Sequence, residues 1–527
     1  GDATGYVGPR NDLELQVQAI WCEVLGLKPD VVGIHDNFFR LGGDSIISIK
    51  LASRLTQRLN RHVHVSNIFN YPTIASLVKH LQNHTENLPQ IHQLPAEVKQ
   101  YPLSFAQERL WFIEEYEGGS NAYHVPMVYI LDKEIDLSAL THALRCLVGR
   151  HEILRSRIQT DTRGLGYQEL LIPNGDDFPV GHQEVSSEAD LDAALKIDAN
   201  RVYDLTTDYP LRASIYEYKV SSRESRYYLS LVVHHIAFDG WSMGILLRDL
   251  EAFYENAVSG NSSSELLPKL KIQYKDFAYW QRQYLSGERL TRMLDFWREQ
   301  LTGYETLHLP LDNKRGRDID YRGSDTFFEL DEETSNGLRN LARELKVSLY
   351  SVLLSGYYLL LRAYSNQDDL VVGTPVSNRH YHQVEDLIGF FVNSLALRIH
   401  VSGDESLSGF IRRVGETVIA AQLHQDLPFE KLVEALMIEK DTSRHPIFQV
   451  MFTLQNFGGN KLSKGGVLGH HYTPTESQYE IAKFDLSTVL DDSDSQIRGG
   501  FNYAMGLFNE ETILGYQETY IEILRQL

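Results

Sequence analysis

The chain has 527 residues, with 50 Lys plus Arg against 71 Asp plus Glu and a formal net charge of −21. Its hydrophobic content of 43% and charged content of 23% are those of an ordinary globular protein, which excludes a disordered or fibrous chain. The acidic balance disfavours a nucleic-acid-binding protein, because such proteins neutralise phosphates with Lys and Arg. At about 150 residues per domain, the length predicts three or four structural units.

Two cysteines, Cys22 and Cys146, are too few for a disulfide framework or a cysteine zinc site. They fit a reducing compartment, and we expect a cytoplasmic protein without a bound metal. The N-terminal segment 1–14 lacks the apolar core of a signal peptide. The longest nearly apolar stretch, residues 347–361, is too short and too polar to span a bilayer. We therefore expect no membrane and no nucleic acid among the partners.

The N-terminal region has the pattern of a small helical bundle. Asn11 followed by Glu14 has the form of a capping box, and Gly26 stands where the first helix is expected to end. A second amphipathic helix is predicted from near Asp44 and a third after Pro72. Three such helices in about 80 residues form an all-α bundle near the lower limit of independent stability. The expected bounds of this bundle are residues 1–83.

The next segment, residues 84–100, contains two prolines and no apolar period, which predicts an extended linker. From Tyr101 onward strand-like and helix-like patterns alternate, which predicts an α/β fold. The run SGNSSSE at 259–265 is the most prominent internal break and divides this region into 101–268 and 269–527. Elements predicted on this pattern are a strand at 227–234, a helix from Trp241, and helices near 332–345 and 349–363.

Ser45 stands where the second helix begins, in the segment Leu41-Gly42-Gly43-Asp44-Ser45-Ile46. The glycines allow a tight turn, and the N-terminus of a helix favours a negative group. A phosphodiester on Ser45 would therefore meet a favourable field. The alternative is that Asp44 or Ser45 only caps the helix.

A mostly apolar strand ends in the pair His234-His235, and Asp239-Gly240 then turns into an amphipathic helix. Neighbouring side chains on a strand point to opposite faces, so only one of the two histidines can face a given pocket. Imidazole has an unperturbed pKa near 6.5, which suits proton transfer around neutral pH. The competing interpretations are a histidine without a role, or a metal site, for which no further ligand cluster at metal spacing is evident.

A second chemical hypothesis lies in the same segment. Residues 240–244 read Gly-Trp-Ser-Met-Gly, a formal GxSxG after a strand and before a helix, which is the context of a hydrolase nucleophile elbow. On that hypothesis Ser242 is the nucleophile of a thioesterase-type hydrolase. The region after the linker is long for one such domain, which disfavours it.

The N-terminal bundle, with DNFFRLGGDSIISIKLASRL at 36–55, resembles the peptidyl carrier domains of non-ribosomal peptide synthetases. The remainder resembles the condensation domains of the same synthetases, whose signature HHxxxDG matches residues 234–240. Six more segments match motifs of that family in order: SFAQERLWF (104–112), GRHEILRSRI (149–158), YKDFAYW (274–280), IGFFVNSLALR (388–398), HQDLPFE (424–430) and DTSRHPIFQ (441–449).

The resemblance implies a multi-domain chain: an all-α carrier followed by an α/β condensation domain of two chloramphenicol-acetyltransferase-like lobes in a V. It implies 4'-phosphopantetheine, carried covalently on Ser45, as the cofactor. The implied reaction joins a donor aminoacyl or peptidyl thioester to the α-amine of a second carrier-bound aminoacyl group. The implied partners are an upstream adenylation domain, downstream adenylation and carrier domains, a phosphopantetheinyl transferase, and the carrier-bound aminoacyl substrates.

Roles of single residues follow from the same resemblance. His235 matches the catalytic histidine, as a base or as the group that positions the amine, whereas His234 is expected to face away and brace the strand. Asp239 is expected to form a structural ion pair with Arg155 or Arg150, and to cap the following helix at the same time. Gly240 is expected to offer its N–H to the developing oxyanion. Three polar residues of the other motifs, Asn393, Asp426 and Arg444, are given no chemistry and are expected to pack or to fix loops. Arg109, in the first motif, is expected to face the channel.

Two further members of the fold family are alternatives to condensation. An epimerisation domain shares HHxxxDG and follows a carrier, but the segment DLVVGTPVSNRH at 369–380 fits condensation better. A non-catalytic recruitment domain is expected to have lost His235, which is present here. Because no epimerase separates Ser45 from the condensation region, we expect the donor residue to have the L configuration, as does the acceptor.

Overall fold

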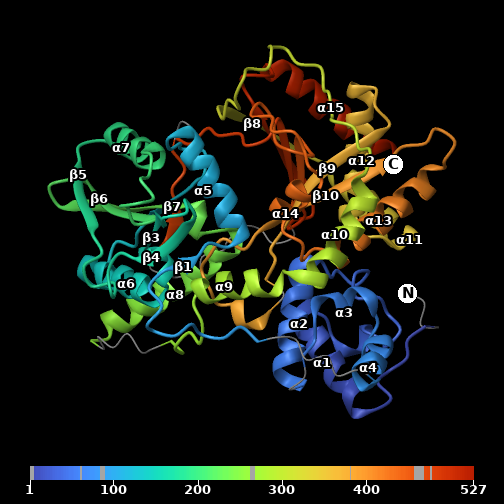
Figure 1. Ribbon diagram of the computed structural model, residues 1–527, viewed down its shortest axis with the longest axis horizontal. Helices are drawn as coiled ribbons and strands as arrows, with labels where there is room; N and C mark the ends of the chain where they lie inside the picture. Colours follow the sequence, from blue (N-terminus) through green and yellow to red (C-terminus); the bar gives the residue numbers. More distant parts are fainter. Residues whose placement is uncertain are drawn as a thin grey trace.

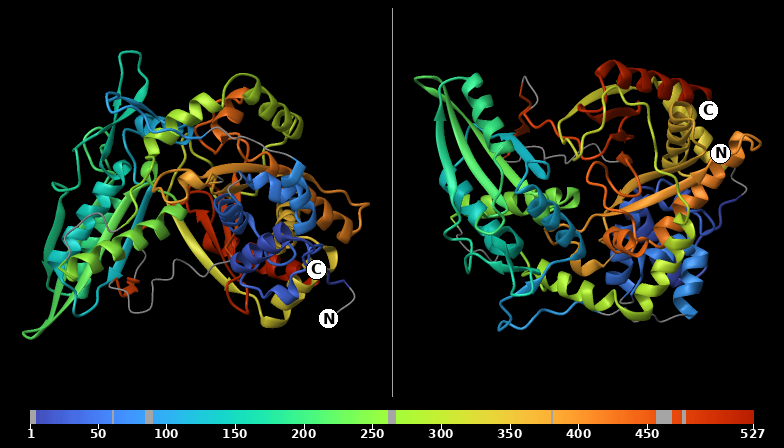
Figure 2. Two further views of the ribbon diagram at one scale, coloured as in Figure 1. Left: turned by 90° about the horizontal axis from the view of Figure 1, so that it is seen from below. Right: turned by 45° about the horizontal axis from the view of Figure 1, so that its top comes forward.

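The computed structural model describes residues 5–59, 62–83, 90–260, 267–379, 381–455, 468–474 and 478–527. Figure 1 shows three bodies: the N-terminal bundle at the lower right, a first α/β lobe at the left and a second α/β lobe at the upper right. In the two further views the two lobes are also separate, and the bundle again lies against the second lobe (Figure 2).

The N-terminal bundle consists of α1 (Asp12–Leu25), η1 (Pro29–Val31), α2 (Ser45–Leu59), α3 (Val65–Asn70) and α4 (Ile74–Asn83). The side chain of Asn11 accepts the N–H of Glu14, and Gly26 ends α1 at φ 68°, so both predicted ends of the first helix are confirmed. The predicted capping box forms only in part, because the Glu14 carboxylate accepts the N–H of Arg10 instead of that of Asn11. The short helix α3 was not predicted from the sequence. Its few apolar residues, which include Ile68 and Phe69, are buried in the bundle core without a periodic pattern of their own.

The first lobe is built on a five-stranded sheet in the order β12-β2-β7-β6-β5, whose edge strand β12 (His470–His471) comes from the C-terminal part of the chain. Leu229, Leu231 and Val233 alternate along β7 and face a core shared with α6 and α8, while α7 covers the other face. A small sheet, β1-β4-β3, lies beside it. The bounds are β1 (Tyr101–Pro102), α5 (Phe105–Glu117), β2 (His124–Ile130), α6 (Leu137–Arg150), η2 (Glu152–Arg155), β3 (Ser156–Thr160), β4 (Gly166–Leu170), β5 (Val180–Val185), α7 (Glu188–Asn200), β6 (Leu211–Ser221), β7 (Glu224–His234), η3 (His235–Ala237), α8 (Gly240–Val258) and α9 (Tyr274–Tyr284).

The second lobe is built on a six-stranded sheet in the order β10-β9-β11-β13-β14-β8. Its core is formed with α12, α13 and α15, and the predicted helices near 332–345 and 349–363 correspond to α11 and α12. The bounds are α10 (Gly287–Leu301), β8 (Gly323–Glu329), α11 (Glu332–Leu345), α12 (Leu349–Ser365), β9 (Asp369–Val376), η4 (His382–Val384), β10 (Asn393–His400), α13 (Leu407–Leu423), α14 (Phe429–Ala435), β11 (Val450–Gln455), β12 (His470–His471), β13 (Leu486–Asp491), β14 (Arg498–Ala504) and α15 (Glu510–Gln526).

The packing of the first lobe extends past the expected boundary at 268/269. Tyr274 and Phe277 of α9 belong to the first-lobe core, as do Leu387 and Phe391 from beyond β9. Strand β12 pairs with β2, with His470 opposite Ile130. The Ser/Gly-rich break therefore separates α8 from α9 without separating the two cores. Most of that break, residues 261–265, lies outside the described residues.

The second half of the expected linker is extended and bound to the condensation region. Ile91 is buried, and its N–H donates to the side chain of Gln383 at 2.9 Å. The N–H of Leu94 donates to Asp276 of α9 at 2.8 Å. Residues 84–89 of the linker lie outside the described part. Among the helices of the described residues, none is long and apolar enough to cross a membrane.

Candidate functional site: the attachment serine and the lobe junction

Ser45 is the first residue of α2 and is partly exposed. The helix is capped by its neighbour, because the Asp44 carboxylate accepts the N–H of Ile47 at 2.7 Å. Gly43 is required by close packing, since a Cβ there would lie 2.3 Å from the Phe38 ring. Of the two candidates for the cap, Asp44 fills that role and leaves the Ser45 hydroxyl available. A hydroxyl at a helix N-terminus suits a phosphodiester, so the residues present fit phosphopantetheine.

Ser45 lies against the surface of the second lobe. Gln422 of α13 donates from Nε2 to the Ser45 hydroxyl oxygen at 2.7 Å. Further contacts join the bundle to the two lobes: Ser53 with Glu385 at 2.5 Å, His64 with Asp426 at 3.9 Å, and Lys50 at 5.8 Å from the Trp241 ring centroid. Trp241 is the second residue of α8, so the N-terminal bundle lies beside the N-terminal end of that helix, which follows the histidine pair in the sequence.

His235 follows the last residue of β7 and is partly exposed. Its backbone N–H donates to Tyr123 at 2.8 Å, and its ring lies 6.0 Å from that of Phe390. Nδ1 lies 3.0 Å from the carbonyl oxygen of Phe238, which can only accept, so Nδ1 carries the proton and Nε2 has a free lone pair. Burial, followed by the charge of Lys483, holds the pKa of His235 well below its usual range. The ring is thus neutral near pH 7 and able to accept a proton at Nε2.

His234 is fully buried and turned away from this position. Its Nδ1 accepts the N–H of Ile236 at 3.0 Å, which places the proton on Nε2, 3.8 Å from the Glu114 carboxylate. It lies against His124 and Tyr203 in the first-lobe interior. These contacts agree with the bracing role expected of His234.

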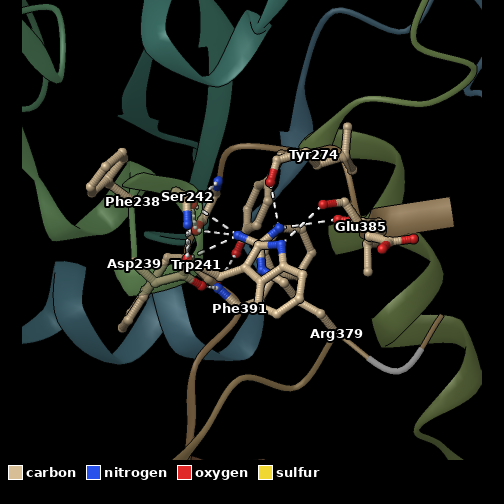
Figure 3. A network of polar contacts seen from close by, with 12 residues as sticks. Phe238, Asp239, Trp241, Ser242, Tyr274, Arg379, Glu385 and Phe391 are labelled. Atoms are coloured by element: carbon tan, nitrogen blue, oxygen red, sulfur yellow. Dashed lines mark hydrogen bonds and ion pairs between the residues drawn. The ribbon is translucent and has the colours of Figure 1, made fainter. Parts of the chain in front are cut away.

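Asp239 is buried in a network between the two lobes (Figure 3). Oδ1 accepts from the N–H of Ser242 at 3.0 Å, so Asp239 is the N-cap of α8, as expected. The same oxygen accepts from Arg379 Nη2 at 2.9 Å, and Oδ2 accepts from the N–H of Phe391 at 2.9 Å. Arg379 is fully buried and also donates to the carbonyl oxygens of Val384 and Leu387. Both carboxylate oxygens therefore accept hydrogen bonds within the protein, and the buried carboxylate belongs to the structural network.

The prediction that Asp239 forms an ion pair with Arg155 or Arg150 is wrong. Arg155 donates to main-chain carbonyls, including that of Val148 at 3.1 Å. Arg150 pairs at 3.1 Å with Asp249, which lies ten residues further along the same helix and therefore about 15 Å from Asp239. The partner, Arg379, lies 140 residues further along the chain, in the segment 369–380. A buried pair between residues so distant in sequence leaves no local signal.

Ser242 is fully buried and cannot act as the nucleophile of a hydrolase. Its hydroxyl lies 2.8 Å from Asp239 Oδ1 and accepts from Arg379 at 2.8 Å and from the N–H of Gly389 at 3.0 Å. Among the described residues, no histidine contacts it to act as a base. The GxSxG match is thus part of the structural network, and the hydrolase hypothesis loses its nucleophile.

The remaining motif residues fix loops or join the domains. The Asn393 side chain donates to the carbonyls of Gln425 and Leu427 at 3.0 and 2.8 Å, which holds the HQDLPFE loop. Asp426, in that loop, faces the carrier. Arg444 pairs with Asp441 at 2.9 Å. Arg109 reaches across to the second lobe and donates to His445 Nε2 at 3.0 Å. Gly240 is exposed and opens α8, so its N–H has no partner within the helix.

Comparison with known proteins assigns both parts of the chain. A family model described as "Condensation domain" matches residues 97–527, and one described as "Phosphopantetheine attachment site" matches residues 16–81. The N-(5-amino-5-carboxypentanoyl)-L-cysteinyl-D-valine synthase of Amycolatopsis lactamdurans is 40% identical over all of this chain. The malpinin synthetase of Mortierella alpina is 36% identical over 96% of it. The chain spans only 14% and 6% of these two relatives.

Solved structures show the same fold. The X-domain from teicoplanin biosynthesis aligns with a TM-score of 0.75 at 27% identity, covering 83% of this chain and 97% of that one. The first condensation domain of the calcium-dependent antibiotic synthetase aligns with a TM-score of 0.66 at 20% identity, over 82% and 97%.

The sequence motifs also suggest tyrocidine synthetase as the source of such a pair. An epimerisation domain from a tyrocidine synthetase aligns with a TM-score of 0.64 at 17% identity, covering 84% of this chain and 98% of that one, and this likeness shows the fold alone. That source therefore stays a prediction. The two family matches confirm the family resemblance: the chain belongs to the condensation domain family of non-ribosomal peptide synthetases and carries a phosphopantetheine attachment domain on its N-terminal side.

Proposed function

We propose that the chain joins the acyl group carried on Ser45 to the α-amine of an aminoacyl group on a downstream carrier, and that His235 serves this step. The observation that supports the proposal most strongly is the docking of the carrier. The Ser45 hydroxyl contacts Gln422 at 2.7 Å, and the same helix places Lys50 over Trp241, beside the turn that bears His235. The bundle that carries Ser45 thus contacts the helix that begins five residues after His235.

The chemistry requires little of the protein beyond positioning and proton transfer. When attached, phosphopantetheine supplies the thiol that carries the donor group as an activated thioester. An α-amine has a pKa near 7.7–8.0, so about a tenth to a sixth of it is neutral at pH 7 and the protein has only modest work to do to supply the neutral form. The free lone pair of His235 Nε2 can orient that amine and take its proton as the new C–N bond forms and the C–S bond breaks. The N–H of Gly240, at the positive end of α8, can stabilise the oxygen on which charge develops.

The partners follow from this assignment. The proposal requires a phosphopantetheinyl transferase acting on Ser45, an adenylation domain that loads it, and a downstream carrier with its own adenylation domain. We also propose an L-configured donor and a cytoplasmic location. The stereochemistry is tested by loading matched L- and D-aminoacyl groups on Ser45 and comparing their transfer rates, and a faster D-donor would overturn it.

The function is tested by reconstitution. Ser45 is converted to its phosphopantetheine form and loaded with an aminoacyl group, a separate aminoacyl-carrier is added, and both carriers are analysed by mass spectrometry. A dipeptide on the acceptor, absent with Ser45→Ala, is the expected result. Release of the donor as free acid would indicate hydrolysis, and donor epimerisation without transfer would indicate an epimerase. No change in the loaded donor would favour a recruitment domain, and each of these three results would overturn the proposal.

A further inference from the structure

Lys483 lies three residues before β13, on the side of the second lobe that meets the first. Its backbone neighbourhood is fixed, because the N–H of Ala482 donates to Tyr321 at 2.8 Å. The next side chain, Phe484, packs on the ring of His445 at a centroid distance of 4.8 Å. Nζ of Lys483 lies 5.1 Å from the ring centroid of Tyr123 in the first lobe.

Tyr123 connects this ammonium group to the histidine. The Tyr123 carbonyl accepts the backbone N–H of His235 at 2.8 Å, so the residue that contacts Lys483 also fixes the histidine in place. The charge of Lys483 lowers the pKa of His235, second only to burial of the imidazole. The lysine and the histidine are thus linked through one residue, since the ring of Tyr123 contacts the ammonium group at 5.1 Å and its carbonyl oxygen accepts the N–H of His235.

Lys483 has no carboxylate partner among the described residues. Lys275 provides the contrast, since it also lies over a tyrosine ring, that of Tyr101 at 4.5 Å, but pairs with Glu152 at 2.8 Å. The pKa of Lys275 is raised. Burial without such a partner lowers the pKa of Lys483 to about 8. Partial burial of an ammonium group without a counter-ion costs free energy and does not stabilise the fold. Its positive charge instead lowers the pKa values of the basic groups around it.

The other charged or titratable groups near His235 lower its pKa less than Lys483 does, or are paired with other groups. His234 and His124 lie behind it in the first-lobe interior, and the Glu114 carboxylate of α5 lies 3.8 Å from His234. Asp239 is paired with Arg379. Among the charged groups of the described part, Lys483 has the largest effect on the pKa of His235.

We infer that Lys483 is a positioning residue of amide-bond formation: its ammonium group, held over Tyr123 without a carboxylate partner, keeps both the imidazole of His235 and the incoming α-amine neutral. The inference rests on the proposed function. A positive charge disfavours any second positive charge nearby, so it favours the forms of both groups that have a free lone pair. Those are the forms that the reaction needs.

The sign of the effect on pH dependence follows. Without the ammonium group, the pKa values of His235 and of the bound amine both rise, and each group becomes protonated at a higher pH. The acid limb of the transfer rate therefore moves to higher pH. The effect is largest below about pH 8, because Lys483 itself loses its charge above that pH.

The test uses the loaded chain with Lys483→Gln, Lys483→Arg and the matched control Lys275→Gln. Dipeptide formation is measured in single turnovers between pH 5.5 and 9. For Lys483→Gln, the ratio of the rate at pH 6.5 to that at pH 8.5 should fall about three- to tenfold relative to wild type. Lys483→Arg keeps the charge and should restore the wild-type ratio within about twofold. Lys275→Gln should keep the wild-type profile even if it lowers stability.

A second measurement follows the histidine directly. The NMR titration of the labelled His235 imidazole should show a higher pKa in Lys483→Gln than in wild type. An unchanged pH profile and an unchanged imidazole titration in Lys483→Gln would overturn the inference, as would a Lys483→Arg variant that behaves like Lys483→Gln. If wild type forms no dipeptide at any pH, the proposed function fails and this inference fails with it.

Discussion

The turn that carries His235 and the helix end that carries Asp239 differ in how completely their polar atoms are bonded. Asp239 accepts hydrogen bonds on both carboxylate oxygens, and its cation, Arg379, is fully buried. His235, four residues earlier, uses only Nδ1 and keeps the lone pair of Nε2 free on a partly exposed ring. Buried polar groups that bond within the protein fix the junction of the lobes, whereas partly exposed polar groups are available to a substrate. Lys483 and Ser45 belong with His235 in this division.

The largest expected effect is on the rate. His235→Ala removes the only proton acceptor identified at the reacting position, so transfer should slow by about 10²- to 10⁴-fold. The midpoint of thermal unfolding should change little, because the side chain has a single hydrogen bond. Mass spectrometry of the acceptor carrier and a melting curve are the two readouts. A variant that retains wild-type transfer would show that His235 is not used.

The converse prediction concerns stability. Arg379→Met leaves the Asp239 carboxylate buried without a cation, which should lower the free energy of unfolding by about 3–5 kcal/mol. Arg362→Met is the matched control, since Arg362 pairs with the exposed Asp368 at the surface and that pair should contribute less than about 1 kcal/mol. Urea denaturation of both variants measures the difference. Equal stability of the two would contradict the structural role of Arg379.

The variant Ser242→Ala tests whether the Ser242 hydroxyl has a structural role or acts as a nucleophile. The variant leaves donors of Arg379 and Gly389 without their acceptor in the interior, so we expect a loss of about 1–3 kcal/mol in unfolding free energy. Transfer per folded molecule should stay within about twofold of wild type, measured with active-site titration of the loaded carrier. If Ser242→Ala folds but loses all turnover, the result would support a catalytic role of Ser242 and with it the hydrolase hypothesis.

The smallest expected effect is at the docked carrier. Gln422→Ala removes one hydrogen bond to Ser45, which is worth about 0.5–1.5 kcal/mol, so transfer should slow by about two- to tenfold. Gln526→Ala, on α15, removes an exposed glutamine that contacts Glu522 and should have no effect. Conversion of Ser45 to its phosphopantetheine form, followed by mass spectrometry, should proceed equally in both. Faster transfer in Gln422→Ala would show that this contact holds the carrier in an unproductive position.

The sequence predicted the elements whose signals are local. Asn11 and Gly26 mark the ends of α1 because a cap and a left-handed residue act within one turn. The histidine pair was placed correctly at the end of β7 because strand alternation needs only neighbouring residues. The partner of Asp239 was assigned wrongly, since Arg379 lies on the far side of the lobe junction. Gln422 and Lys483 were missed for the same reason: their relevance depends on the docking of domains and lobes, for which no periodicity exists.

The central claim, that His235 serves the reaction and Arg379 serves the fold, is tested most directly by one measurement. The single-turnover rate of dipeptide formation per folded molecule is compared among wild type, His235→Ala and Arg379→Met, with the folded fraction of each determined under the same conditions. The account predicts a folded but inactive His235→Ala and a destabilised Arg379→Met whose folded fraction transfers at nearly the wild-type rate. A stable Arg379→Met without activity, together with an active His235→Ala, would contradict it.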